Sequence, residues 1–208
     1  DLNEKSVIAV DTETTSLNPQ EASLVGISIS YAANIAYYIP LGHKNVKGLK
    51  KELVLNKLKT ILEDPSIKKV GQNIKYDVKI FNRVGINLTC VDDTMLMSYA
   101  LHGGLHRHNM NALAEIYLKH EPIKIQSLLG SGKTARTFDK VPVNIAVNYA
   151  AEDADVTLRL WYIFKSKLIK NKMNHVYERL ERPMIKLLAD MELTGISVDK
   201  ILLTGMSN

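Results

Sequence analysis

Two carboxylates, those of Asp11 and Glu13, directly follow an apolar run near the start of the chain. Residues 7–10 (VIAV) predict a short interior strand, and in an extended chain residues two apart point to the same face. Both acids should therefore project together from the end of this strand. Two like charges so close are costly unless one takes up a proton or a cation lies between them. A solvated turn, in which Asp and Thr side chains bond the local backbone, is the alternative that this segment leaves open.

Two further acidic segments lie later in the chain. Asp77 stands in GQNIKYD, on the first turn of a predicted helix that follows a short strand. In NYAAEDADVT, within a long predicted helix, Tyr149 and Asp153 are four residues apart and so share one face. Glu152 and Asp155 lie off that face and are expected to be solvated. Taken singly, each segment has an ordinary explanation, because a carboxylate is favoured at a helix N-terminus and a Tyr on a helix usually packs in the core.

Taken together, the carboxylates of the three segments suit one chemistry. Oxygen ligands of this kind select Mg²⁺ or Mn²⁺. Two such ions about 3.5–4 Å apart can activate an attacking water and stabilise the leaving oxygen of a phosphodiester. We therefore predict a two-metal phosphodiester hydrolase that uses Asp11, Glu13, Asp77 and Asp153.

The elements that must position these groups follow from hydrophobic periodicity and turn signals. Strands are predicted over residues 6–10, 23–31, 36–41 and 67–72, the first three as an antiparallel meander. Helices are predicted over residues 50–63, 73–86, 92–101, 109–118, 143–169 and 172–193. Pro183 should kink or break the last helix, and residues 119–142 predict a loop. Strands followed by helices, with one more strand among them, imply a mixed sheet flanked by helices.

The composition narrows the class of protein. A chain of 208 residues with 46% apolar and 24% charged residues is typical of one soluble globular domain. Its single cysteine, Cys90, excludes an internal disulfide, fits a reducing compartment and is expected to be a buried, inert thiol. The net charge of +5 permits a polyanionic partner without requiring one.

Two other motifs have simpler interpretations than the ligand sites that they suggest. Gly132, Lys133 and Thr134 suggest a phosphate loop, but that motif needs a glycine five residues earlier, where Ser127 stands. A basic loop near the nucleic acid is preferred. The histidines at positions 102, 106 and 108 suggest zinc, but a polar loop is preferred because the one cysteine is distant and the spacing is not helical.

The three acidic motifs resemble those of the proofreading 3′–5′ exonuclease domain of family A DNA polymerases, the bacterial DNA polymerase I type. DTETTSL is similar to the first motif, GQNIKYD to the second and YAAEDADVTLRLW to the third, and RHNMNALAEIYL is similar to the helix that links the last two. The resemblance covers nearly the whole chain. It implies an α/β fold of the ribonuclease H-like kind, with a mixed central sheet that begins as an antiparallel meander and is flanked by α-helices.

The resemblance also implies an activity and its catalytic residues. The activity is release of nucleoside 5′-monophosphates from the 3′ end of single-stranded or frayed DNA, with two Mg²⁺ or Mn²⁺ ions. Asp11, Glu13 and Asp153 would hold the first metal, and Asp11 with Asp77, directly or through water, the second. Tyr149 would orient the attacking water together with Glu13.

The same resemblance implies a set of DNA-binding residues. Leu17 matches an apolar wedge against the terminal base, and Arg107 matches a phosphate-binding arginine. Ile125 stands where the family has an aromatic residue that packs against the strand. The whole implied DNA-binding set is Thr12, Leu17, Gln72, Asn73, Tyr76 and Arg107.

Residues 178–199 resemble the segment that opens the polymerase domain. We therefore expect an exonuclease domain over residues 1–170 and, over 171–208, a helix and the start of a polymerase domain that continues beyond the chain. The polymerase domain would be the partner in cis of the exonuclease domain. The exonuclease domain is otherwise expected to be a monomer with no membrane contact. Its expected location is the bacterial cytoplasm and nucleoid, or an organelle if the source is eukaryotic. Two alternatives stay open: an RNA-trimming exonuclease of the ribonuclease D kind, which shares the four acids and the tyrosine, and a non-catalytic exonuclease fold that supports a polymerase.

Overall fold

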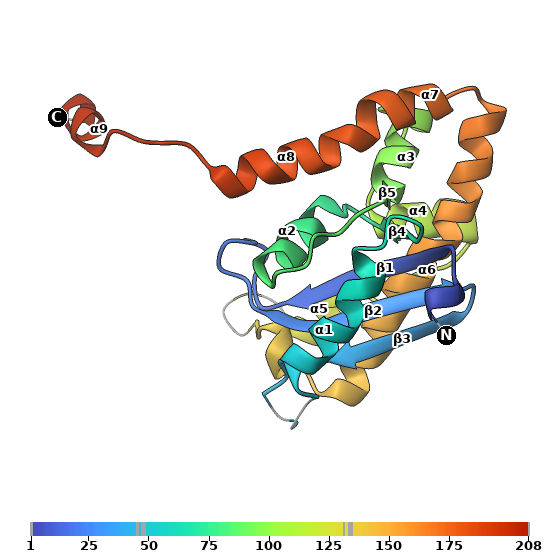
Figure 1. The fold of residues 1–208 in the computed structure, drawn as a ribbon, viewed down its shortest axis with the longest axis horizontal. Helices are drawn as coiled ribbons and strands as arrows, with labels where there is room; N and C mark the ends of the chain where they lie inside the picture. Colours follow the sequence, from blue (N-terminus) through green and yellow to red (C-terminus); the bar gives the residue numbers. More distant parts are fainter. Residues whose placement is uncertain (1, 45, 47–48, 131, 133–134, 208) are drawn as a thin grey trace.

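A mixed five-stranded sheet lies at the centre of the computed structural model, which describes residues 2–44, 46, 49–130, 132 and 135–207. The strands are β1 (Val7–Thr14), β2 (Leu24–Ala32), β3 (Ile35–Pro40), β4 (Lys68–Gly71) and β5 (Val91–Asp93). They run in the order β3-β2-β1-β4-β5 (Figure 1). β1, β2 and β3 form the predicted antiparallel meander, whereas β1, β4 and β5 are parallel. The predicted mixed sheet is confirmed, with β5 as an additional strand where a helix start was expected.

The helices agree with the predicted ones, except in three places, one of which is an additional helix after the last predicted one. They are α1 (Lys51–Leu62), α2 (Lys75–Arg83), α3 (Thr94–His102), α4 (Met110–Leu113), α5 (Ile125–Leu129), α6 (Val143–Lys170), α7 (Asn174–Val176), α8 (Arg182–Thr194) and α9 (Lys200–Ser207), with π-helical turns over Ala114–Leu118 and Tyr177–Glu181 and 3₁₀ turns over Leu2–Glu4 and Phe138–Lys140. The predicted loop over 119–142 contains α5 and a 3₁₀ turn. The last predicted helix is helical without a gap over residues 174–194, but it contains a π-helical turn directly before α8, and Pro183 lies in the first turn of α8. Within the described ranges, no helix has both the length and the apolar character needed to span a bilayer.

Alternating side chains of β1 pack on opposite faces of the sheet. Ile8 and Val10 belong to the core that α1 and α2 cover, whereas Ala9 belongs to the core that α6 covers. Because side chains alternate along a strand, Asp11 and Glu13 lie on the same face as Ala9, beneath α6. The fold therefore directs the acid pair toward the helix that carries the third motif.

β1 continues through both acids, which corrects the prediction that the strand ends before them. Asp11 pairs with Ser28 of β2, and Glu13 pairs with Gly26. A Cβ on Gly26 would clash with the hydroxyl and ring atoms of Tyr38 on β3, so only glycine leaves room for that side chain. Main-chain pairing with β2 holds the acids in a regular strand, which is a more rigid support than a turn.

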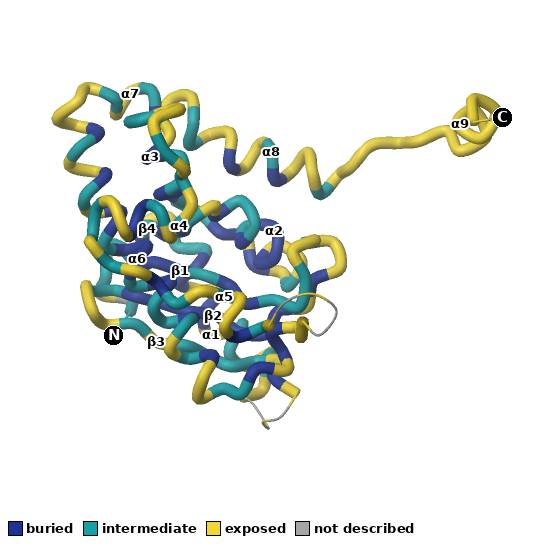
Figure 2. Tube along the Cα trace, turned by 180° about the vertical axis from the view of Figure 1, so that it is seen from behind, coloured by how far each residue is buried: buried dark blue, intermediate teal, exposed yellow. Residues whose placement is uncertain are grey.

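The helices after residue 170 pack against β5, at the edge of the sheet, and against α2. Tyr177 is fully buried; its hydroxyl accepts a hydrogen bond from the main-chain N–H of Asp93 and donates one to Asp92 of β5, at 2.9 and 3.2 Å. Glu192 of α8 forms ion pairs with Lys75 and Lys79 of α2. Beyond Thr194 the chain is exposed and extends to α9 (Figures 1 and 2).

Candidate active site

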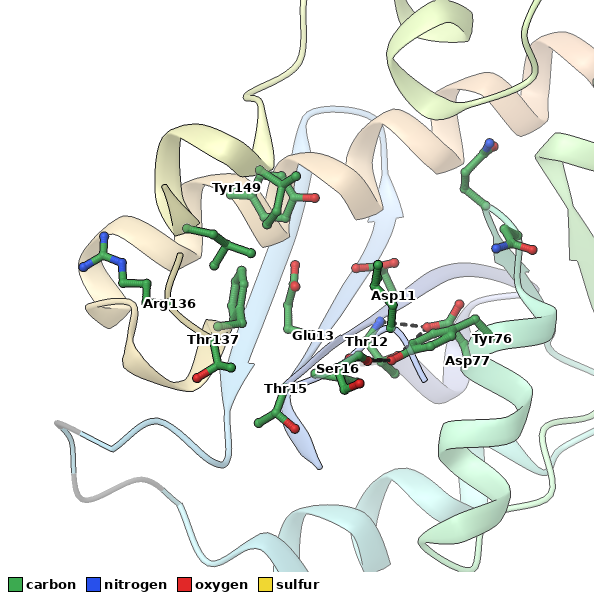
Figure 3. A pocket seen from close by; sticks show the side chains of 17 residues that line it. Asp11, Thr12, Glu13, Thr15, Ser16, Tyr76, Asp77, Arg136, Thr137 and Tyr149 are labelled. Carbon is green, nitrogen blue, oxygen red and sulfur yellow. Dashed lines mark hydrogen bonds between the residues drawn. The ribbon is translucent and has the colours of Figure 1, made fainter. Parts of the chain in front are cut away.

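A pocket of about 600 Å³ opens beside the C-terminal end of β1. Its walls come from residues 11–17 of β1 and the following loop, from residues 72, 73, 76 and 77 at the start of α2, from residues 125, 129 and 136–138, and from Tyr149 of α6 (Figure 3). The three acidic motifs, far apart in the sequence, therefore meet at this pocket or beside it.

Three carboxylates converge where Asp11 and Glu13 line the pocket. Oxygen atoms of Asp11, Glu13 and Asp153 all lie within 4.8 Å of one another. The side chains of Glu13 and Asp153 are buried, and Oε1 of Glu13 has no hydrogen-bond partner among the described residues. A buried carboxylate oxygen without a donor is costly unless a cation satisfies it. These residues therefore fit a divalent cation with oxygen ligands.

Burial and mutual repulsion make this cluster unfavourable when all its members are charged. Burial raises the pKa of Asp11 from 3.8 to about 6, although the main-chain N–H of Thr12 opposes the shift. Burial, and then the charges of Asp11 and Asp153, raise the pKa of Glu13 well above its ordinary value. Burial and the charge of Asp11 likewise raise the pKa of Asp153. Each of these carboxyl groups therefore binds its proton more tightly than a solvated carboxyl group does, and a bound cation would favour the charged forms.

The fourth acid, Asp77, stands apart from the cluster and is held by Thr12. Its Oδ1 accepts hydrogen bonds from the main-chain N–H of Thr12 at 3.0 Å and from the Thr12 hydroxyl at 2.5 Å (Figure 3). Burial, and then the charge of Asp11, raise the pKa of Asp77 well above its ordinary value. Thr12 points to the opposite face of β1 from Asp11, and so ties α2 to the strand that carries the acid pair.

Tyr149 lies one turn before Asp153 and lines the pocket, as its spacing predicts. Burial, and then the negative charge of Asp153, raise its pKa above 10. A hydrogen bond from the Tyr149 hydroxyl in turn lowers the pKa of Asp153, although burial outweighs this effect. The phenol is therefore neutral at physiological pH and can serve as a hydrogen-bond donor beside the acids.

Most of the implied DNA-binding residues line the pocket. Leu17 is 95% exposed at its rim, and Gln72, Asn73 and Tyr76 form the wall at the start of α2. The Tyr76 hydroxyl donates to the main-chain oxygen of Ser16 at 2.6 Å, which ties that wall to the loop after β1.

Arg107 and Arg136 lie at different places relative to the pocket. Arg107 is exposed in the loop between α3 and α4 and does not line the pocket. Arg136 does line it, together with Ile125 and Phe138, and is the only Lys or Arg among the described lining residues. Its Nε donates to the main-chain oxygen of Leu128 at 2.8 Å. Sequence reasoning missed Arg136 as a site residue; the available signal was the basic segment GKTAR, in which Lys133 and Thr134 lie outside the described residues.

Glu152 and Asp155 are not solvated, which corrects the expectation from helical spacing. Glu152 accepts hydrogen bonds from His120 Nε2 at 2.8 Å and from the main-chain N–H of Ile123 at 2.7 Å. Asp155 accepts from the main-chain N–H of Asn34 and pairs with Arg159. The chain after the helical segment 110–118 contacts α6 through Glu152, and the turn after β2 contacts it through Asp155. The two acids that lie off the face of Tyr149 and Asp153 therefore anchor loops.

Cys90 and the histidine loop are also placed by the structure. Cys90 is half-buried, not buried as predicted. It lies in the turn just before β5, with φ of 51°. The rings of His106 and His108 are 5.0 Å apart, and His108 Nδ1 is hydrogen-bonded to the Ser98 hydroxyl at 2.9 Å.

Comparison with known proteins identifies the family. A model of the 3′–5′ exonuclease family of DNA polymerase A matches residues 1–169. The chain belongs to this 3′–5′ exonuclease family. Among curated relatives of the exonuclease, DNA polymerase I of Rhizobium leguminosarum is 44% identical over 227 residues, covering 100% of the chain and 22% of the relative. DNA polymerase I of Pseudomonas aeruginosa is 40% identical over 209 residues, covering 97% and 23%. The exonuclease chain thus spans about a fifth of the length of these relatives.

Solved structures confirm the ribonuclease H-like fold of the exonuclease. Brucella melitensis NrnC superposes with a TM-score of 0.75 at 23% identity, covering 97% of this chain and 91% of that one. Escherichia coli RNase D, an exoribonuclease, gives a TM-score of 0.66 at 18% identity, with coverages of 91% and 46%. The family is one of nucleases, so the predicted hydrolase class is confirmed at that level.

Proposed function

We propose that this exonuclease releases nucleoside 5′-monophosphates from the 3′ ends of single-stranded or frayed DNA, and that it proofreads for a DNA polymerase I of which it forms part. The observation that carries the proposal is the convergence of Asp11, Glu13 and Asp153 within 4.8 Å beside a pocket with Leu17 at its rim. The decisive assay is release of mononucleotides from a labelled single strand with Mg²⁺.

The proposed roles of the acids follow from their contacts. Asp11, Glu13 and Asp153 would hold one divalent cation, and Asp11 with Asp77 a second; Mg²⁺ is the expected ion and Mn²⁺ a substitute. Bound cations would supply activation of the attacking water and stabilisation of the leaving oxygen. Tyr149 and Glu13 would orient that water from the wall and floor of the pocket.

The proposed path of the strand follows the pocket walls. Leu17, exposed at the rim, would wedge against the terminal base, while Gln72, Asn73 and Tyr76 would contact the last nucleotides. Ile125 offers an apolar surface but no stacking ring. Arg136 supplies the positive charge that a carboxylate-lined pocket needs to hold a polyanionic strand. Arg107 would reach a phosphate further along.

The proposed partner in cis is the polymerase domain. The family match ends at residue 169, and the following helices pack on β5 and α2 through Tyr177 and Glu192. We propose that residues 171–208 lead from the exonuclease domain, residues 1–170, into that polymerase domain.

Metal removal should make the free energy of unfolding depend on pH. Because Asp11 has a pKa of about 6 in the folded protein and 3.8 ordinarily, the folded state binds more protons between these values. The metal-free protein should therefore lose stability as pH rises from about 4 to about 6, and stay less stable above that. At pH 7.5, Mg²⁺ at about 100 times its Kd should add about 2.7 kcal/mol, or about 5–10 °C in Tm. Thermal melts with EDTA or Mg²⁺ at pH 5 and 7.5 measure both effects; a Tm that Mg²⁺ does not raise at pH 7.5 contradicts the metal assignment.

Unpaired 3′ ends should be degraded faster than matched ends. A strand must enter the pocket singly, and each base pair that melts costs about 1.4 kcal/mol, or about tenfold in rate. Primer–template duplexes with zero, one or three terminal mismatches should therefore be degraded at increasing rates. Equal rates on these three substrates would remove the basis for proofreading.

A matched RNA strand separates this proposal from an RNA-trimming function. The 2′-hydroxyl is the feature by which a site tells RNA from DNA. We expect an all-DNA strand to be degraded faster than an all-RNA strand of the same sequence. Faster degradation of RNA would favour the ribonuclease D alternative, and no degradation of either would favour a non-catalytic fold.

A further inference from the structure

The turn between β4 and α2 carries two of the residues proposed to contact the strand, Gln72 and Asn73. Asn73 has φ of 58°, in the left-handed region that residues other than glycine adopt uncommonly, asparagine more often than most. The turn is also tight, because a Cβ on Gly71 would lie 2.7 Å from the side chain of Ile74. A conformation of this kind persists only where its surroundings impose it.

Two buried residues at the β5–α3 junction, Asp93 and Thr94, hold the turn in this conformation. The Asp93 carboxylate accepts hydrogen bonds from the main-chain N–H groups of Asn73 at 2.9 Å and Ile74 at 3.0 Å. The Thr94 hydroxyl shares its one proton between two acceptors, Oε1 of Gln72 at 2.5 Å and the main-chain oxygen of Gly71 at 3.1 Å. Asp93 is 1% exposed and Thr94 is fully buried.

The same contacts fix the side chain of Gln72. Its Oε1 accepts from Thr94, and its Nε2 donates to the main-chain oxygen of His108 at 2.7 Å. The amide is therefore held from both ends on the pocket wall. Ordering a long side chain on binding costs conformational entropy. Because Gln72 is already ordered, it should lose less conformational entropy when a strand binds.

We propose that Asp93 and Thr94 are positioning residues for the DNA strand: they hold residues 71–74 in the left-handed turn that presents Gln72 and Asn73 to the pocket. This inference rests on the proposed function, because it assumes that the pocket binds a strand. Neither residue lines that pocket, so both act through the turn. The acid cluster stands on β1 and α6, which neither residue contacts by a side-chain hydrogen bond in the described part of the chain.

The test is Thr94→Val, which keeps the side-chain shape and removes the hydroxyl. In the full chain, we expect KM for a single-stranded DNA to rise about tenfold, with kcat changed less than about twofold. The Kd of a fluorescein-labelled oligodeoxythymidylate, measured by anisotropy in EDTA, should rise by the same factor. Thr94→Ser retains the hydroxyl and should restore both values.

Thr89→Val is the matched control. The Thr89 hydroxyl also donates to a main-chain oxygen, that of Glu63 at 2.9 Å, but Thr89 neither lines the pocket nor bonds to residues 71–74. This variant should leave KM and Kd unchanged even if its Tm falls. If Thr94→Val lowers Tm without changing KM or Kd, or lowers kcat alone, the positioning role is wrong. If the wild type binds the oligonucleotide but releases no nucleotide, the proposed activity is wrong, and the Kd values of the variants still test the positioning role. If the wild type does not bind the oligonucleotide, the proposed activity and the positioning role are both wrong.

Discussion

Asp11→Ala should abolish nucleotide release while leaving the fold intact. Asp11 is the one residue proposed to contact both cations, and its oxygen lies within 4.8 Å of those of Glu13 and Asp153. Without it, the remaining carboxylates repel one another around weakly held ions. Metal stabilisation of a reacting phosphodiester is worth several kcal/mol, so the rate should fall about 10³-fold or more. Release of a labelled 3′ nucleotide in saturating Mg²⁺ is the measurement.

The same substitution should raise the Tm of the metal-free protein at pH 7.5. Burial raises the pKa of Asp11, which means that its charged form destabilises the fold, and alanine removes that charge. Asp190→Ala is the control: it removes an exposed carboxylate that pairs with Lys186 at 2.9 Å, and should change neither activity nor the response to Mg²⁺. More than a few per cent of wild-type activity in Asp11→Ala would show that the metal assignment is wrong.

The acid cluster could be predicted because each part of it depends on a local period. Residues two apart share a face of a strand, which pairs Asp11 with Glu13, and residues four apart share a face of a helix, which pairs Tyr149 with Asp153. The alternation of Ile8, Ala9 and Val10 then decides which face of the sheet meets α6. Local periods carry this information whether or not the tertiary contacts are known.

The residues that escaped prediction depend on contacts between distant segments. Phe138 and Arg136 reach the pocket because Phe138 packs with Leu128 and Val25 in a small separate core, and residues 119–142 show no periodicity that predicts this. Asp93 lies in a strand of only three residues, which is too short for a period of two to distinguish from a helix start. Its role becomes visible only through its hydrogen bonds to the turn at Asn73.

Tyr149→Phe separates the contribution of the tyrosine from that of the acids. The ring packs in the small core beside Phe138, with centroids 6.1 Å apart, and phenylalanine keeps that contact. Because the pKa of Tyr149 is raised above 10, the phenol is a poor general base, and its proposed role is to position the attacking water. Loss of the hydroxyl should lower kcat about 10- to 10³-fold and leave metal affinity and single-strand binding nearly unchanged.

Asp153→Ala should give the opposite pattern. It removes an acid of the cluster, so it should lose metal binding together with activity. Mn²⁺ titration calorimetry beside single-turnover release of a 3′ nucleotide distinguishes the two variants, with Tyr162→Phe as control, since Tyr162 is 51% exposed on the same helix. If Tyr149→Phe loses metal as severely as Asp153→Ala, or cleaves at the wild-type rate, the hydroxyl does not position water and Tyr149 contributes only its packed ring.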